Sequence, residues 1–379
     1  MKNFKRNILS AICMWLYLPL HATTYYVSPA GKNSNSGTSI NSPWQTTSKI
    51  NTKNFNGDTI LFQGGFTFSG GLSFTQSDVG TSTKPIFISS YGTGRATIST
   101  DSLTHGFYAY NTAGFKITNL NFKGPGSTKN DRSGIIFYLD KAATTLSYIN
   151  ISYSDVSGYK YSGISVGSWN NASGYRDVTI KNCTVHDNGL EGISTYAQAY
   201  YIHQNVYIGY NKVYDNMGIP DKAIGNSGSG IVVGGVKNAT VEYCSVYNNG
   251  ALHTNANGGP VGIWAYESSN VIFQYNESHH NKTGNSKDGG GFDLDGGCIN
   301  SIIQYNYSHD NYGAGYLVAQ YSGAPVSKNN IIRYNISEND ARKNDYGAIH
   351  IWSYTSSIYI QGLDIYNNTI YITSVSGAT

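Results

Sequence analysis

Two aspartates separated by one residue stand in a glycine-rich stretch, Lys287-Asp-Gly-Gly-Gly-Phe-Asp-Leu-Asp-Gly-Gly-Cys298. Alternate residues of an extended strand share a face, so Asp293 and Asp295 are expected about 6.5–7 Å apart on one side. Two carboxyl groups this close repel, and one keeps its proton while the other ionises. Hydrolysis of a glycosidic bond requires this division into acid and base. The alternative is a solvated or calcium-bound pair of aspartates.

Six other segments share the pattern of this strand, a small residue followed by a short strand; they begin at Gly163, Gly192, Gly230, Gly262, Gly315 and Ala348. In each, the first and third residues after the small one are predicted to face inward, and the second and fourth outward. The early outward pairs carry no chemical group, whereas the last four pairs read Trp264/Tyr266, Asp293/Asp295, Leu317/Ala319 and His350/Trp352. This concentration predicts a groove about 14 Å long, enough for about three sugar units.

Large aromatic residues flank the predicted acid pair. We interpret Trp264, Tyr266 and Trp352 as platforms for sugar rings, because exposed aromatics around acids favour binding. The alternative is an aromatic ladder that only stabilises the sheet. Glu267 and Gln320 follow their strands and are expected either to hydrogen-bond substrate hydroxyls or to serve as turn residues. Glu267 is also a reserve acid or base.

Four further residues are predicted to serve the groove. His350 is expected about 10 Å from Asp293, where it contacts a neighbouring sugar or acts as the base on a lyase substrate. Tyr316 is a second candidate for that base. Asp288 is expected to hold the glycine-rich bend, coordinate calcium or bind substrate. Arg342 lies in a loop that either recognises a carboxylate or sulfate or is a solvated bend.

Histidines recur at one repeat offset, in a column that reads His186, Tyr214, Tyr247, His279, His309 and Glu338. A column that accepts Tyr and Glu favours a turn position over a metal site. The adjacent pair His279-His280 has the chemistry of metal ligands, but no carboxylate stands at a convincing spacing from it. The metal content therefore stays open. The predicted reaction requires no cofactor, and calcium is compatible with the acids.

One spacing recurs from about residue 115 to the end: an apolar-x-apolar pair, two residues, a small polar residue and a turn. The small polar position reads Ser154, Cys183, Asn211, Cys244, Asn276, Asn306, Asn335 and Asn368. A period near 30 residues is typical of stacked repeats, and the apolar period of two within each unit is that of a strand. Helical repeats are therefore excluded. The recurring asparagine predicts an amide ladder about 4.8 Å per step, with Cys183 and Cys244 as free, buried members of the same column.

Two or three short strands per coil, joined by Gly, Asn and Asp bends, describe a parallel β-helix. On these repeats the chain resembles secreted bacterial right-handed parallel β-helix proteins of the pectate-lyase-like superfamily. The resemblance covers nearly the whole mature chain, including Tyr25-Tyr-Val-Ser-Pro-Ala-Gly and Pro43-Trp44. It implies activity on polysaccharides. The chain lacks the Asn-Thr-Asp, Asp-Asp, His-Gly and Arg-x-Lys series of polygalacturonases, so no catalytic residue is transferred from them, and fold alone does not determine the reaction.

The predicted organisation has three parts. Residues 1–22 have the basic start, short apolar run and terminal Ala22 of a signal peptide, which predicts a secreted, periplasmic or cell-surface protein. Residues 23–60 are predicted to form an N-terminal cap with the first strand, including a short helix after Pro43. Residues 61–379 are predicted to form the β-helix, with no matching plug at the end, which suggests truncation at the C-terminus.

The charge balance narrows the class of partner. Without the three cations of the leader, 22 basic residues face 22 acidic ones. A neutral surface argues against nucleic acid or an anionic membrane as partner, and no other segment is long and apolar enough to cross a membrane. We expect a monomer that acts on a polysaccharide.

Three functions are consistent with the sequence. The first is a secreted glycoside hydrolase that uses Asp293 and Asp295. The second is a polysaccharide lyase or uronate epimerase, with His350 or Tyr316 as base. The third is a non-catalytic surface protein whose groove only binds glycan.

Overall fold

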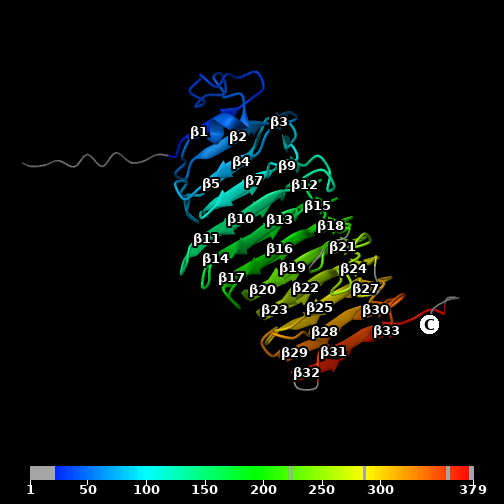
Figure 1. The fold of residues 1–379 in the computed structure, drawn as a ribbon. Coiled ribbons are helices and arrows are strands. Elements are labelled where there is room, and N and C mark those ends of the chain that lie inside the picture. The colour runs from blue at the N-terminus through cyan, green and yellow to red at the C-terminus, as the bar shows by residue number, and fades with distance from the viewer. Residues whose placement is uncertain (1–21, 221, 223–224, 285–286, 356–358, 375–379) are drawn as a thin grey trace, which may run out of the picture.

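The computed structural model describes residues 22–220, 222, 225–284, 287–355 and 359–374. The predicted signal peptide lies outside the described residues except for Ala22. The described chain is an all-β parallel solenoid of three sheets, as predicted, and its coils stack along one axis from the N-terminal to the C-terminal end (Figure 1). Each full coil contributes one strand to each sheet.

The 12-stranded sheet contains β1 (Thr24–Val27), β2 (Thr59–Gln63), β5 (Ile86–Tyr91), β8 (Phe115–Thr118), β11 (Thr145–Ser152), β14 (Gly174–Lys181), β17 (His203–Gly209), β20 (Val236–Glu242), β23 (Ser269–Gln274), β26 (Ile302–Gln304), β29 (Lys328–Arg333) and β32 (Gln361–Tyr366). The 10-stranded sheet contains β4 (Leu72–Phe74), β7 (Phe107–Tyr110), β10 (Ile135–Leu139), β13 (Ile164–Ser168), β16 (Glu191–Ala197), β19 (Ser229–Gly234), β22 (Val261–Tyr266), β25 (Gly290–Leu294), β28 (Tyr316–Gln320) and β31 (Ile349–Ser353).

The 11-stranded sheet contains β3 (Thr67–Ser69), β6 (Ala96–Ser99), β9 (Leu120–Lys123), β12 (Asp155–Ser157), β15 (Thr184–His186), β18 (Lys212–Tyr214), β21 (Ser245–Tyr247), β24 (Glu277–His279), β27 (Tyr307–His309), β30 (Ile336–Glu338) and β33 (Thr369–Tyr371). The single helix among the described residues is α1 (Thr47–Ile50), within the segment predicted to be helical. No helix of the described chain has the length and apolarity needed to cross a membrane.

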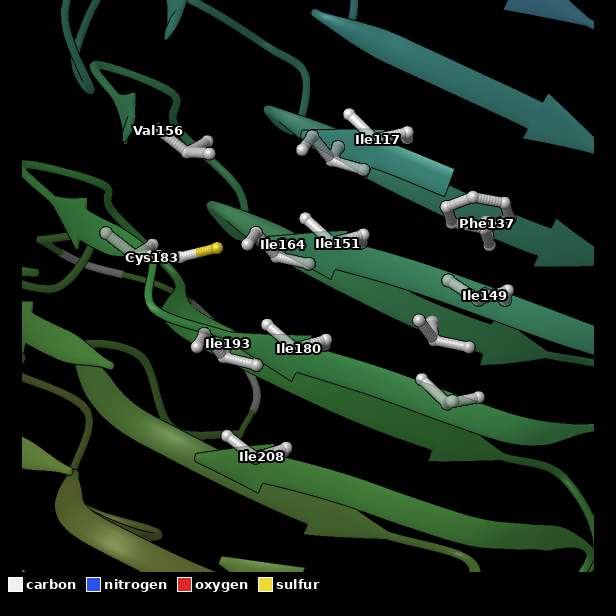
Figure 2. Packing of buried hydrophobic residues seen from close by; sticks show 14 of the residues in the cluster. Ile117, Phe137, Ile149, Ile151, Val156, Ile164, Ile180, Cys183, Ile193 and Ile208 are labelled. Carbon is white, nitrogen blue, oxygen red and sulfur yellow. The ribbon is translucent and has the colours of Figure 1, made fainter. Parts of the chain in front are cut away.

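The core is built from columns of identical or similar apolar side chains. Ile117, Ile151, Ile180 and Ile208 come from successive strands of the 12-stranded sheet, pair in register and are completely buried (Figure 2). Alternation along each strand places every second side chain inside. Stacking each coil on the next therefore buries the apolar face that a single coil leaves exposed.

The predicted amide ladder is present at the bend after the 12-stranded sheet. The side-chain nitrogen Nδ2 of Asn276 donates to Oδ1 of Asn306 over 3.0 Å, and Asn306 donates in turn to Asn335 over 3.1 Å. Cys244 continues the column, since its backbone N–H donates to Oδ1 of Asn276. The three described cysteines are free and buried, as predicted.

A second ladder, not predicted, runs five residues after the first, along Asn188, Asn216, Asn249, Asn281, Asn311 and Asp340. Each amide again donates to the same atom of the next coil, at 2.7–3.0 Å. Two ladders at two bends fix both the height and the rotation of every coil relative to its neighbours.

The N-terminal segment packs on the first coils. Trp44 is buried and stacks on Tyr25 of β1, with ring centroids 4.6 Å apart. Its indole N–H donates to the carbonyl of Asn35. The loop between β1 and α1 is therefore fastened to the end of the core (Figure 1).

We predict that Asn306→Ala lowers the free energy of unfolding by about 2–4 kcal/mol, because it leaves the buried N–H of Asn276 and the carbonyl of Phe273 without partners. Denaturant titration measures the loss. Asn306→Cys places the residue type found at 183 and 244 in the same column and should cost less. Equal losses in the two variants would contradict the ladder account.

Candidate active site

A pocket of about 490 Å³ opens on the outer face of the 10-stranded sheet, over β25, β28 and β31. Its size is that of a small-ligand site. The loops before β22, β25 and β31 and the loop after β28 also contribute to its lining. Its lining is Asn257, Gly258, Lys287, Asp288, Asp293, Asp295, Leu317, Ala319, Tyr321, Asn344, Asp345, Tyr346, His350 and Trp352.

Strand pairing places one chemical group after another along the floor of the pocket. In register, Asp293 of β25 pairs with Trp264 on one side and with Leu317 on the other, and Leu317 pairs with His350 of β31. His350 is thus two strands from Asp293, the separation that the repeat predicted. Asp295 follows the end of β25 and is fixed by a backbone bond from its N–H to the carbonyl of Ala265.

Asp293 is the most deeply buried acid of the pocket. It is 3% exposed, and the structure gives its Oδ1 atom no hydrogen-bond partner. Burial, then the charges of Asp295 and Asp288, raise its pKa well above the ordinary value. Burial therefore favours the protonated form of Asp293, and a ligand in the pocket would supply the partner that Oδ1 lacks.

Asp295 is only partly buried, because one side of its carboxyl group faces the open pocket. Desolvation raises its pKa to about 7, and the backbone N–H of Gly296, which donates to Oδ1 over 2.7 Å, opposes that rise. A carboxyl group with a pKa near neutrality can both give and take a proton under physiological conditions.

Asp288 reaches the pocket from the bend before β25. Its backbone is left-handed (φ 54°), as is that of Gly289 (φ 76°). The hydroxyl of Tyr346 donates to its Oδ1 over 2.9 Å, while burial raises its pKa. That hydrogen bond favours the ionised form and opposes the rise. Asp288 is thus the acid of the three with a side-chain donor.

The glycines before Asp293 serve the packing of the coils. A Cβ atom on Gly291 would lie 2.2 Å from Oγ of Ser308 and one on Gly290 would lie 2.6 Å from the carbonyl of Ala314. Both contacts are shorter than atoms tolerate. These glycines are therefore required for the close approach between coils.

The predicted aromatic platforms divide between two hollows. Trp352 is 43% exposed and lines the pocket with the acids. Trp264 is only 9% exposed, since its indole N–H donates to Oγ of Ser229, and with Tyr266 it lines a separate hollow toward the N-terminal end of the same sheet. The expected single groove is thus a pocket with a neighbouring hollow. Glu191, half-buried and accepting a hydrogen bond from the Ser162 hydroxyl, also lines that hollow.

Several predicted binding residues take structural positions instead. Tyr316 points into the core, stacks on Phe292 and donates to backbone carbonyls, so its assignment as a base facing substrate is corrected. Gln320 is completely buried, and its amide holds the loop that ends at Ser327. The guanidinium of Arg342 bonds to Asn339 and Thr373. None of these three lines the pocket.

Glu267 lies behind the pocket wall. Its carboxylate accepts the hydroxyl of Tyr321 over 2.9 Å, and Tyr321 itself lines the pocket. Burial raises the pKa of Glu267. The structure therefore gives Glu267 a position from which it orients Tyr321.

Tyr321, Tyr346 and Asn344 were not predicted as site residues. All three stand in loops after or before the strands of the 10-stranded sheet. Strand alternation, the signal that found the acids, does not extend into loops. The tyrosines nevertheless follow and precede β28 and β31 at short distance, and a search of loop residues next to the acid-bearing strands would have found them.

Comparisons with known proteins agree with this architecture. Residues 219–370 match the family model described as the right handed beta helix region. A lacto-N-biosidase of Bifidobacterium longum subsp. longum is 27% identical over an alignment of 458 positions, which spans 92% of this chain but only 27% of the relative.

Two solved structures show the same fold. The native GH136 lacto-N-biosidase from Eubacterium ramulus superposes with a TM-score of 0.67 at 19% identity, covering 93% of this chain and 68% of that one. Pectate lyase Pel9A superposes with a TM-score of 0.53 at 17% identity, covering 94% and 78%. The chain thus has the right-handed parallel β-helix fold that these two proteins share.

The raised pKa of Asp295 predicts a pH-dependent stability. Between the ordinary pKa of 3.8 and about 7, the folded state binds a proton that the unfolded state has released, so stability falls as pH rises through this window. Asp295→Asn removes this effect. We expect the variant to gain melting temperature relative to wild type at pH 8 and to gain little at pH 4.

Thermal unfolding at both pH values measures the difference. Asp364→Asn, at an exposed position of β32, is the control. Its melting temperature should differ from that of wild type by the same amount at pH 4 and at pH 8. An Asp295→Asn effect that is the same at pH 4 and pH 8 would contradict the raised pKa.

Proposed function

We propose that this protein is a glycoside hydrolase that cleaves an oligosaccharide or polysaccharide in the pocket over β25, β28 and β31. The observation that carries the proposal is the gathering of Asp288, Asp293 and Asp295 in one pocket, all with raised pKa values and one with a buried oxygen that has no partner. The sequence similarity to a lacto-N-biosidase supports the same reaction class.

Asp295 is the proposed general acid. Its pKa of about 7 keeps much of the group protonated at neutral pH while leaving it acidic enough to give the proton to a departing sugar oxygen. Its position on the open side of the pocket gives it access to the scissile bond. The proton moves from the Asp295 carboxyl to the glycosidic oxygen as the carbon–oxygen bond breaks.

Asp288 is the proposed carboxylate partner, as a base that activates water or as a nucleophile. The Tyr346 hydroxyl donates a hydrogen bond that stabilises its charge, and Asp288 is the one acid of the three with such a side-chain donor. This assignment replaces the predicted Asp293–Asp295 pair with an Asp288–Asp295 pair.

Asp293 is the proposed neutral donor. Burial and the neighbouring acids raise its pKa well above the ordinary value, and a protonated carboxyl group donates a hydrogen bond from its O–H. Between the two other acids on the pocket floor, it is placed to hold a sugar hydroxyl or the ring substituent. Asp293 thus orients substrate without transferring a proton.

Binding is assigned to the residues that rim the acids. Trp352 offers an exposed indole face for a sugar ring, and His350, edge-on to Tyr346 with ring centroids 4.8 Å apart, offers a hydrogen bond beside it. The hollow lined by Trp264, Tyr266 and Glu191 extends the path along the sheet for further sugar units.

We also propose that the chain is exported through the signal sequence at residues 1–22 and acts outside the cytoplasm. A lacto-N-bioside is the first substrate to test, because the similar protein from B. longum is a lacto-N-biosidase.

Substitution separates the three roles. Asp295→Asn and Asp288→Asn should each lower kcat by about 10²–10⁴-fold, the usual contribution of an acid or base. Asp293→Asn keeps a neutral hydrogen-bond donor and should cost less than either, whereas Asp293→Ala should lose more than Asp293→Asn. If Asp293→Asn is as inactive as Asp295→Asn, proton transfer belongs to Asp293.

Leaving groups distinguish the acid from its partner. The nitrophenolate of a nitrophenyl glycoside leaves without being protonated. On such a substrate, Asp295→Asn should therefore recover much of the lost rate, and Asp288→Asn should not. In wild type, kcat/KM should fall above about pH 7 as Asp295 loses its proton, and this limb should vanish in Asp295→Asn. Kinetics over pH 4–9 measure both effects.

Product analysis tests the reaction class on a panel of lacto-N-bioside, neutral, uronic and sulfated glycans. Hydrolysis yields new reducing ends without an unsaturated uronate. An unsaturated product would identify a lyase, and tight binding without turnover would identify a glycan-binding protein. Either result would overturn the proposal.

A further inference from the structure

Three histidines gather on a different sheet from the pocket. His279 ends β24 and His309 ends β27, which are neighbouring strands of the 11-stranded sheet (Figure 1). His280 follows β24 with a left-handed backbone (φ 54°). All three side chains reach solvent, His280 most of all.

The ring nitrogens converge. Nδ1 of His279 lies 2.8 Å from Nδ1 of His280, and one nitrogen of each ring lies within 4.8 Å of those of the other two. Two imidazoles on a tetrahedral metal ion hold their nitrogens about 3.3 Å apart, given metal–nitrogen bonds of about 2.0–2.1 Å. Changes of about 0.5–1.5 Å in the separations between these nitrogens, within reach of small side-chain rotations, therefore convert the cluster into a ligand set.

Carboxylates complete the surroundings. Nδ1 of His309 lies 2.9 Å from Oδ2 of Asp310, and its Nε2 lies 3.4 Å from Oε1 of Glu277. A metal ion on one nitrogen of His309 would displace the carboxylate from that nitrogen, and the carboxylate on the other nitrogen would orient the ring and increase its basicity. The carboxylates were not visible as a metal motif in the sequence, because Glu277 and Asp310 belong to successive coils.

The column that contains His279 and His309 also contains His186, which can be compared with them. His186 has the same pair of flanking acids, with Nδ1 2.6 Å from Asp187 and Nε2 3.4 Å from Asp155, but its stacked neighbour is Tyr214. The flanking acids are thus a repeated feature that a lone histidine shares. What distinguishes the later site is the convergence of two further imidazoles.

We propose that His279, His280 and His309 bind one divalent transition-metal ion, of the Zn²⁺ or Ni²⁺ type, on the outer face of the 11-stranded sheet. Imidazole nitrogen is a ligand that these ions prefer over Ca²⁺ or Mg²⁺. The ion joins two successive coils at the start of the loop from β24 to β25. It lies outside the pocket, and the proposal does not depend on the reaction performed there.

Variants can be taken from the column itself, so that folding is preserved. His279→Tyr and His309→Tyr introduce the residue that stacks at 214 and 247, and His280→Asn introduces the residue that makes the same left-handed turn at 248. His186→Tyr is the matched control, since it removes a histidine flanked by two acids elsewhere in the column. The mature chain is used without a histidine tag.

Titration with ZnCl₂ by calorimetry, and melting with and without ZnCl₂, test the proposal. Wild type and His186→Tyr should bind one ion and melt at a higher temperature with zinc, and chelator should reverse the shift. His279→Tyr, His280→Asn and His309→Tyr should each bind at least about 10-fold more weakly and lose the shift. Absence of a zinc-dependent shift in wild type, or unchanged binding in all three variants, would overturn the site.

Discussion

Strict register between successive coils is the constraint on which every functional feature of this molecule depends. A single coil has no stable core, so its side chains acquire fixed positions only through the coils above and below. Two amide ladders, one through Asn276 and Asn306 and one through Asn281 and Asn311, tie neighbouring coils at two of their bends. A slip by one residue would turn Asp293 from the pocket into the core and break both ladders.

Register explains the electrostatics of the pocket. Because Asp293 is held between Trp264 and Leu317 on paired strands, little of its carboxyl group is exposed to water, and the neutral form is favoured. Asp295 stands just past the strand end, where the pocket opens, and its proton is held less firmly. Position along one short segment thus separates two otherwise identical acids into a fixed donor and a group that titrates near neutrality.

The sequence predicted the features that repeat. One spacing recurs several times along the chain, so the pattern in each coil supports the prediction for the next. The repeat period, the first ladder and the outward positions of Asp293 and Asp295 all follow from this spacing. The second ladder recurs at the same repeat spacing, five residues after the first, but it was not predicted. Tyr316 was misassigned although its own position in the strand pattern pointed inward.

The features that could not be predicted from the sequence depend on contacts between residues that do not recur at the repeat spacing. Trp264 is covered because Ser229, one coil earlier, accepts its indole N–H, and no alternation rule reports such a contact. Tyr346 and Tyr321 enter the pocket from loops whose lengths differ between coils. The partner of Asp288 therefore emerged only from the folded structure, as did the meeting of His280 with a histidine of the next coil.

Burial on this sheet raises the pKa of Asp293 well above its ordinary value and that of Asp295 to about 7. Carbon-13 NMR of aspartate carboxyl groups, assigned with the single asparagine variants and followed from pH 3 to pH 9, tests it directly. The account predicts one carboxyl carbon that titrates near pH 7 and disappears in Asp295→Asn, and another that stays protonated at higher pH and disappears in Asp293→Asn. Titration of both groups near pH 4 would contradict it.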